Sequence, residues 1–404
     1  MAASVTAPPP VRHPLRTRPF RLLFTGRVLS LTGDAVIPAA LALAVLEATG
    51  STGALALVLA CAMVPKLVLL PVGGVLADRF DARAIALVTD LVRCAAQLLV
   101  GAQLLGGSPA LWLIAAASAA GGAAGAFAMP TGAPLVRGTV AAEALHRANA
   151  ALGIAQSAAR VGGPALAGAL VLTVGPGWAF VLDAASFALS AALLAVLRID
   201  RVPVPHRSFP ADLREGWREV RSRDWYWTSL VAHSAWNGAA AVLMTLGPAL
   251  ALDRLGGAGA WVLLLQAGAV GLLAGSLLAD RLSPSRPVLA ANLALASYAL
   301  PLLLLAAGAP AWAVIAAYGL AQAGLGFLNP LWDTVVQRTI PEQVLARVVS
   351  YDWLLSLAAM PVGYALAPLA ADLWGPGVPL AVAALLVGGC CLATALVPGV
   401  RRVR

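Results

Sequence analysis

Long apolar runs recur along almost the whole of this 404-residue chain, and they leave it few possible folds. A helix needs about 20 apolar residues to cross a hydrocarbon core roughly 30 Å thick. In lipid, only helices and closed barrels satisfy all their backbone hydrogen bonds, and these runs lack the alternating pattern of barrel strands. The chain is therefore predicted to be an all-α integral membrane protein with twelve transmembrane helices. These segments lie near 21–46, 53–76, 84–106, 110–135, 148–173, 177–197, 225–250, 259–279, 287–307, 310–336, 349–371 and 377–398.

Composition excludes a water-soluble domain. With 60% hydrophobic and 11% charged residues, the chain has too few polar groups to cover a surface in water. Most of its outer surface is therefore expected to face the lipid bilayer. The first twenty residues contain Pro and Arg but no short apolar core before a small-residue cleavage site, so no signal peptide is expected.

The two halves of the chain repeat one another. The stretch Gly74-Val75-Leu76-Ala77-Asp78-Arg79 returns 202 residues later as Ser276-Leu277-Leu278-Ala279-Asp280-Arg281. Nine further positions between Phe127 and Leu166 carry the same residue type as the position 200 residues later. Parallel repeats in an apolar chain are typical of transporters whose halves enclose a substrate site. We predict two pseudo-symmetric six-helix bundles, at 21–197 and 225–398.

A polar segment at 198–224 links the two predicted bundles. Within it, Leu213, Trp217 and Val220 recur at helical spacing among Arg and Glu, which predicts an amphipathic helix. Such a helix either lies on the membrane surface or is a solvated linker without membrane contact. The segments 1–20 and 399–404 are the remaining tails, and both are expected to be cytoplasmic.

Basic residues predict the orientation of the chain, because Lys and Arg collect in cytoplasmic loops. If both termini are cytoplasmic, the cytoplasmic segments hold 22 of the 27 basic residues and the opposite face holds only Arg254. We therefore expect a multi-pass protein of the inner, cytoplasmic membrane. The net charge of +9 is interpreted as this topological signal, and no nucleic-acid partner is expected.

Several classes of chemistry have no motif in the sequence. The only lysine is Lys66, so no Gly-x-x-x-x-Gly-Lys loop for ATP exists, and any pumping has to draw on an ion gradient. The four cysteines lie in predicted helices at spacings that suit neither a metal site nor a disulfide. We expect no cofactor, no metal and no enzymatic activity, and a proton gradient is the suspected energy source.

Short motifs give the chain a resemblance to a known family. The stretch from Gly74 to Arg83 resembles the loop signature of the major facilitator superfamily, although Asp81 and Ala82 stand where Gly and a basic residue are usual. The stretch Gly163-Pro164-Ala165-Leu166-Ala167-Gly168 resembles an element of antiporters in that superfamily. The residues from Phe20 to Asp34 and Asp90-Leu91-Val92-Arg93 are similar to the bacterial enterobactin-exporter-like, secretion-effector branch.

The resemblance implies a secondary active transporter that works by alternating access. We expect a monomer that exports a small amphipathic molecule, such as a drug or a siderophore-like metabolite, by proton-coupled antiport. An importer or facilitator of the same fold is the main alternative. A membrane-embedded lipid-modifying enzyme and a non-transporting scaffold are more remote ones. The predicted fourth helix lacks the membrane-embedded Arg of many drug–proton antiporters, so coupling through that residue is not expected.

The repeated Asp-Arg motif is expected to act as a gate. A carboxylate at a helix end can accept hydrogen bonds from the free N–H groups of another helix N-terminus, for roughly 0.3–2 kcal/mol. Asp78 should then face residues 347–352, and Asp280 the region around Asn149. The alternative is an ordinary surface Asp-Arg pair worth less than about 1 kcal/mol. The gate motif comprises Gly74, Asp78, Arg79, Arg83, Asp280 and Arg281.

Ionisable residues at membrane depth are the best pointers to function, because a charge in lipid costs at least about 2.5–3.5 kcal/mol. At 1.5 Å of rise per residue, Asp34, Arg160 and Asn237 all fall near mid-membrane. We expect Asp34 and Arg160 to form a charge pair that exchanges with a proton or substrate. The alternative is a structural ion pair that never titrates.

Further polar and small residues complete the candidate site. Asp90 and Arg93 share a helix face and are expected to form an intramembrane pair. Gln156, Gln322 and His233 are expected to line the central passage, although His233 also suits a packing role. Gly163, Pro164 and Gly168 predict a bend in the fifth helix, and close helix packing is the alternative explanation for them.

Overall fold

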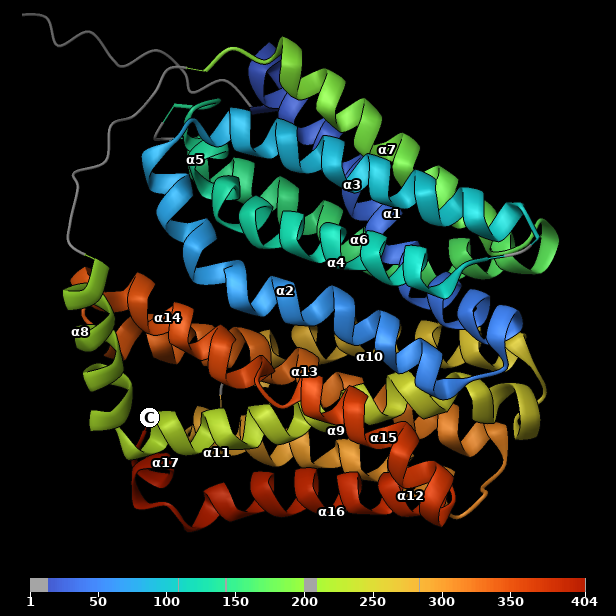
Figure 1. The fold of residues 1–404 in the computed structure, drawn as a ribbon. Coiled ribbons are helices and arrows are strands. Elements are labelled where there is room, and N and C mark those ends of the chain that lie inside the picture. The colour runs from blue at the N-terminus through green and yellow to red at the C-terminus, as the bar shows by residue number, and fades with distance from the viewer. Residues whose placement is uncertain (1–13, 108, 142–143, 200–208, 283, 404) are drawn as a thin grey trace, which may run out of the picture.

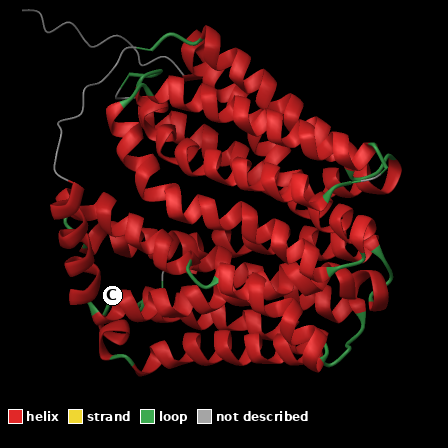
Figure 2. Cartoon of the chain, viewed as in Figure 1, coloured by secondary structure: helices red, strands yellow, loops and turns green. Residues whose placement is uncertain are grey.

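The protein is an almost entirely helical bundle in the computed structural model, which describes residues 14–107, 109–141, 144–199, 209–282 and 284–403 (Figures 1 and 2). The first half contains the helices α1 (Arg18–Thr49), α2 (Thr52–Arg79), α3 (Ala82–Leu105), α4 (Leu111–Ala128), α5 (Gly132–Arg137), α6 (Leu145–Thr173) and α7 (Gly177–Val196). The amphipathic segment of the linker is helical, as predicted, and forms α8 (Phe209–Ser222).

The second half repeats this order. Its helices are α9 (Asp224–Arg254), α10 (Ala258–Leu282), α11 (Pro287–Leu295), α12 (Ala299–Ala306), α13 (Ala311–Thr339), α14 (Glu342–Leu357), α15 (Met360–Trp374), α16 (Gly377–Ala393) and α17 (Pro398–Arg402). Short 3₁₀ turns lie at Pro14–Arg16, Met129–Thr131, Ala296–Tyr298 and Thr394–Leu396.

The predicted fold class is confirmed. By length and apolar content, eleven spans in the described part of the chain are able to cross a membrane. The remaining predicted segment is α6, which is 29 residues long but carries Arg147 and Arg160 and is less apolar than the others. Each of the twelve predicted segments therefore corresponds to helical structure.

Three predicted segments are interrupted where the sequence analysis placed one continuous helix. Each interruption has a proline in it or just after it: Pro130 lies in the turn between α4 and α5, Pro301 follows the turn between α11 and α12, and Pro361 is in the first turn of α15. Proline lacks an N–H donor and its ring crowds the carbonyl four residues earlier, so the α-helical ladder breaks.

The helices of each half pack mainly among themselves. In the first half, α7 packs on α1 and α3, and α2 packs on α4. In the second half, α10 packs on α13, and α9 packs on α15 and α16. The main contacts between the halves are those of α6 with α10 and of α2 with α15. Figure 1 shows the first half, in blue and green, above the second half, in yellow to red.

Among the close helix crossings that glycine permits, one is made at matching positions of the two halves. A Cβ atom at Gly163 of α6 would lie 2.8 Å from the carbonyl oxygen of Ala35 in α1. A Cβ atom at Gly363 of α15 would lie 2.6 Å from the carbonyl oxygen of Gly238 in α9. The two glycines are 200 residues apart in the sequence, so the internal repeat corresponds to the same crossing made twice.

The two halves diverge toward the end of the molecule where α8 lies, which we call the linker end (Figure 1). At the opposite, far end, α6 and α10 are in close contact. A Cβ atom at Gly168 would lie 2.5 Å from Cγ1 of Val262, and Nε2 of Gln266 donates a 3.0 Å hydrogen bond to the carbonyl oxygen of Val161. The interior between the halves is therefore closed at the far end.

Candidate substrate cavity and intramembrane charge network

A cavity of about 730 Å³ lies between the two halves. Helices α1 and α6 contribute its wall on one side, and α9, α10, α11, α13 and α14 contribute the other. Its lining runs from Pro38 and Ala39 of α1 to Val349 and Trp353 of α14. A space of this size holds a drug-sized molecule.

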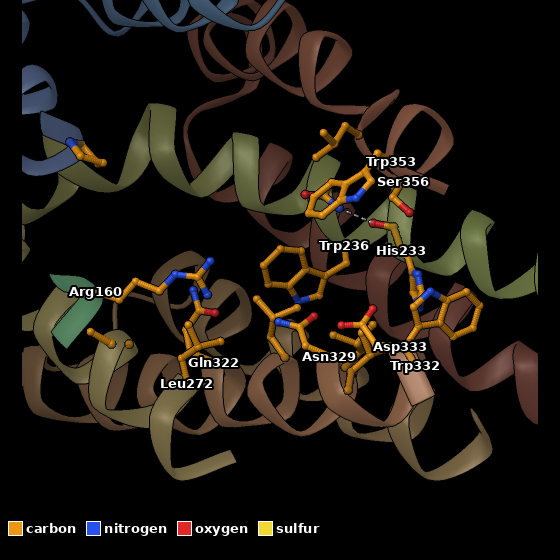
Figure 3. Close-up of a pocket in the computed structure, with 18 of the residues that line it drawn as sticks. Arg160, His233, Trp236, Leu272, Gln322, Asn329, Trp332, Asp333, Trp353 and Ser356 are labelled. Carbon is orange, nitrogen blue, oxygen red and sulfur yellow. Dashed lines mark hydrogen bonds between the residues drawn. The ribbon is translucent and has the colours of Figure 1, made fainter. Parts of the chain in front are cut away.

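The cavity is electrostatically polarised. Arg160 of α6 and Gln322 of α13 lie together at the left of the view in Figure 3, and Asp333 and Trp332 of α13 lie at its right. Asp352 of α14 also lines the cavity. The lining therefore presents a cation and an amide in one region and carboxylates in another.

Aromatic side chains surround Asp352. Its Oδ2 accepts hydrogen bonds from Nε1 of Trp332 at 2.7 Å and from the hydroxyl of Tyr226 at 2.8 Å. Its Oδ1 accepts a 3.2 Å hydrogen bond from Oγ of Ser356. The rings of Tyr226 and Trp332 stack with centroids 5.2 Å apart, and the ring of His233 lies edge-on to Trp332 at 4.7 Å. These contacts hold the carboxylate and the indole in fixed positions.

A separate network of ionisable side chains lies inside the first half. Arg93 of α3 forms an ion pair with Asp34 of α1, and its guanidinium lies 4.0 Å from the ring centroid of Phe187. Nε2 of Gln97 donates a 2.6 Å hydrogen bond to Oδ2 of Asp183 in α7. Asp34, Arg93 and Gln97 border a second cavity of about 450 Å³, which Lys66 of α2 also lines.

The predicted pairing of Asp34 with Arg160 is wrong for this conformation. Asp34 points toward α3, where Arg93 reaches it, whereas the next residue, Ala35, lines the central cavity together with Arg160. Successive residues of a helix point about 100° apart, so Asp34 and Arg160 face different spaces. Arg93 takes the partner role that was expected of Arg160.

The predicted pair of Asp90 with Arg93 is also replaced. Oδ2 of Asp90 accepts a 2.6 Å hydrogen bond from Oγ of Ser190 in α7, and Arg93 binds Asp34. The spacing of three residues brings Asp90 and Arg93 to one side of α3, but each finds a better-placed partner on a neighbouring helix.

Sequence reasoning missed Asp183, which is 0% exposed. It accepts hydrogen bonds from Gln97 and from Oγ of Ser186, the latter at 3.3 Å. The signal was present, because an aspartate within an apolar segment at 177–197 meets the same criterion that selected Asp34. The same criterion would have selected Asp333 and Asp352, which lie within the predicted segments 310–336 and 349–371.

The other predicted lining residues divide between the cavity and the surface. His233, Asn237 and Gln322 line the central cavity, whereas Gln156 is exposed and lies outside the lining. Nδ2 of Asn237 donates a 3.0 Å hydrogen bond to the carbonyl oxygen of His233. Nε2 of Gln322 donates a 2.7 Å hydrogen bond to the hydroxyl of Tyr318. These contacts preorganise part of the cavity wall.

The small residues expected to bend the fifth helix make packing contacts. Gly163 lies against α1 and Gly168 against Val262 of α10, and Pro164 lines the central cavity inside the continuous helix α6. Close helix packing, the alternative explanation, therefore accounts for both glycines.

The expected gate is described only in part. Arg83 donates hydrogen bonds from Nε to the carbonyl oxygen of Leu194 at 2.7 Å and from Nη2 to that of Ala195 at 2.6 Å, so it binds the last turn of α7 in its own half. Arg281 is exposed. The other side chains of the gate motif lie outside the described ones, and the latch stays a prediction for Gly74, Asp78, Arg79 and Asp280.

No group of three or more His, Cys, Asp or Glu side chains that could hold a metal ion occurs among the described residues. The four cysteines, Cys61, Cys94, Cys390 and Cys391, are not joined in disulfides.

Comparison with known proteins places this architecture in context. Residues 23–351 match the sequence profile of the Major Facilitator Superfamily. The multidrug efflux pump Tap of Mycobacterium tuberculosis (strain ATCC 25618 / H37Rv) is 28% identical over 378 residues, which are 88% of this chain and 88% of Tap.

Two crystal structures of a bacterial homologue of the iron transporter ferroportin share the fold. The inward-facing structure matches with a TM-score of 0.70 and 19% identity, and the outward-facing one with a TM-score of 0.63 and 20% identity. In both cases the match covers 94% of this chain and 98% of the other.

Proposed function

Because the chain belongs to the Major Facilitator Superfamily, we propose that it is a secondary active exporter of small amphipathic molecules, driven by proton entry. That it is a membrane transporter rather than an enzyme follows from the family, and the resemblance noted in the sequence is confirmed. The observation that carries the proposal is the cavity of about 730 Å³ between the halves, which is closed by packed helices at the far end.

Alternating access suits this arrangement. The two halves rock against each other around the cavity, so that substrate enters at the linker end and leaves at the far end. The linker end faces the cytoplasm, because the basic residues of the loops collect there. The cavity then takes its substrate from the cytoplasm, which is the direction of loading that export needs. The efflux activity named for Tap supports the same direction.

Proton coupling is assigned to the network in the first half. Asp34 borders a cavity and forms an ion pair with Arg93, so protonation of the carboxylate would release the guanidinium. A carboxylate that is protonated on one side of the membrane and ionised on the other can carry a proton through the cycle. The proposed cycle uses no cofactor. We propose a single chain as the transporting unit, since residues of both of its halves line the cavity.

Transport by purified protein in proteoliposomes tests the proposal. Proteoliposomes that hold the protein in a known orientation are loaded with fluorescent amphipathic probes. A pH gradient of each sign is then imposed across the membrane. We expect probe to move uphill against the direction of proton flow, and a protonophore to abolish that movement. Co-movement of probe and protons would make the protein an importer, and the absence of any gradient-driven flux for all probes would contradict the proposal.

A further inference from the structure

The central cavity carries a region of negative charge that no cation among the described residues neutralises. The carboxylate of Asp333 is exposed, and among the described residues no ion pair or hydrogen bond to it is found. Asp352 accepts hydrogen bonds from three neutral donors, Trp332, Tyr226 and Ser356, and no described cation binds it. Two carboxylates therefore share one region of the cavity without a positive partner in the described chain.

An aromatic face accompanies these carboxylates. Trp353 lines the cavity with half of its surface exposed, whereas Trp332 is buried among Trp225, Tyr226 and His233 and turns its N–H edge to Asp352. A cation within about 6 Å of an indole face gains about 0.5–1 kcal/mol at an exposed site and about 2 kcal/mol or more when it is desolvated. Carboxylates next to indole faces form the combination that binds an organic cation through both charge and ring contact.

Trp236 separates the two ends of the cavity. It lies between Arg160 on the left and Asp333 and Trp332 on the right of Figure 3, and its ring packs against Tyr298 with centroids 4.7 Å apart. Its Nε1 is buried, so the indole contributes apolar surface to the cavity wall.

We propose that the cavity binds an amphipathic organic cation whose charged group lies between Asp333 and Asp352 against Trp353. Arg160 repels a cation from its own end of the cavity, so the molecule binds in one orientation. This inference rests on the proposed role of the cavity as the substrate site, and it names the chemical class of the substrate.

Equilibrium binding to purified protein in detergent tests the charge preference without any gradient. Tetraphenylphosphonium and tetraphenylborate have the same shape and opposite charge, so they separate charge from hydrophobicity. We expect the phosphonium to bind at least tenfold more tightly than the borate. Asp333→Asn and Asp352→Asn should each weaken phosphonium binding at least tenfold. Equal binding of the two ions, or phosphonium binding unchanged in Asp333→Asn, would overturn the inference.

Two variants sharpen this test. Asp372→Asn removes an exposed carboxylate that lies outside the cavity, and it should bind the phosphonium as the unmodified protein does. Asp333→Asn is the decisive variant if Asp352→Asn does not fold, because Asp333 holds no described hydrogen bond. A loss of binding in Asp372→Asn equal to that in Asp333→Asn would show only a long-range charge effect and would also overturn the inference.

The same probes distinguish failure of this inference from failure of the proposed function. If the phosphonium binds as expected but no gradient moves it, the substrate class stands and the export proposal fails. If a neutral probe is exported while the phosphonium does not bind, export stands and the cation inference fails.

Discussion

Arg93 connects the charged side chains of the first half. It pairs with Asp34, lies over the ring of Phe187 and borders the same cavity as Gln97, which donates a hydrogen bond to Asp183. In the proposed cycle, loss of the negative charge on Asp34 would release this guanidinium. The position of one arginine can therefore report the protonation of a carboxylate on a neighbouring helix.

Asp34→Asn tests the coupling role at this site. The amide keeps the size of the side chain but cannot titrate, so we expect the loss of uphill export in proteoliposomes with a pH gradient. Downhill exchange of a neutral substrate should persist. The exposed Asp372→Asn serves as the matched control. Uphill export by Asp34→Asn at the rate of the unmodified protein would mean that this carboxylate is structural.

A double-mutant cycle tests the ion pair itself. Asp34→Asn and Arg93→Gln each leave one charge without its partner inside the membrane, and the combination removes both charges. We expect the double variant to be more stable than the two single losses predict, by an interaction energy of about 0.5–3 kcal/mol. Unfolding of the four purified proteins in detergent measures it. Strict additivity would show that the contact contributes nothing.

Asp183 offers a second residue-level prediction. Asp183→Leu leaves the amide of Gln97 without its acceptor in a buried position, at a cost of about 1–3 kcal/mol. Asp183→Asn retains an acceptor oxygen and should cost less. Thermal unfolding of both variants gives the order. If Asp183→Leu unfolds at the same temperature as the unmodified protein, the hydrogen bond to Gln97 adds no stability.

Helix pairs, rather than single helices, carry the internal repeat. The crossing of α1 with α6 at Gly163 and that of α9 with α15 at Gly363 bring a backbone carbonyl against a glycine in each half. On α1 the residue just before the contact is the charged Asp34, and on α9 it is the neutral Asn237. The duplicated frame is thus kept while the side chains beside it differ.

Neighbouring glycines of α6 provide a controlled test of this crossing. A Cβ at Gly163 would meet Ala35, whereas a Cβ at Gly162 would meet nothing within 4 Å. We expect Gly163→Ala to force α1 and α6 apart and to cost about 1–3 kcal/mol. Gly162→Ala should be neutral or stabilise the helix by up to about 1 kcal/mol. Unfolding temperatures in detergent compare the two, and equal values would contradict a tight crossing.

The two halves of the molecule have different chemical roles. The first half holds the network of Asp34, Arg93 and Asp183, and the second half supplies the aromatic and acidic end of the central cavity, including Asp333 and Asp352. Rocking of one half against the other would therefore change the surroundings of the proposed proton site and of the proposed substrate site together. Such a shared movement is what coupling between two sites requires.

Labelling of single cysteines tests the state of the whole molecule. In a background with the four native cysteines replaced by alanine, Trp353→Cys should react with a membrane-impermeant maleimide in everted vesicles, because it lines the cavity toward the linker end. Asp372→Cys is exposed near the end of α15 and should react only in right-side-out vesicles. The reverse pattern would invert the proposed topology.

The sequence by itself determined the all-helical membrane fold, since long apolar runs have few other structures available in lipid. It also determined that the helices of the second half follow the order of those in the first. Helix interruptions near Pro130, Pro301 and Pro361 were readable in principle, because proline acts locally.

Only the tertiary structure decided which charges meet. Asp34 pairs with Arg93 and not with Arg160, Asp90 turns to Ser190, and Asp183 meets Gln97. Depth in the membrane follows from counting residues along one helix. The partner of a side chain depends on how each helix is rotated about its axis and on which neighbour it packs against. Those two quantities are set by packing across the whole bundle, where contacts join residues about 60 to 100 positions apart.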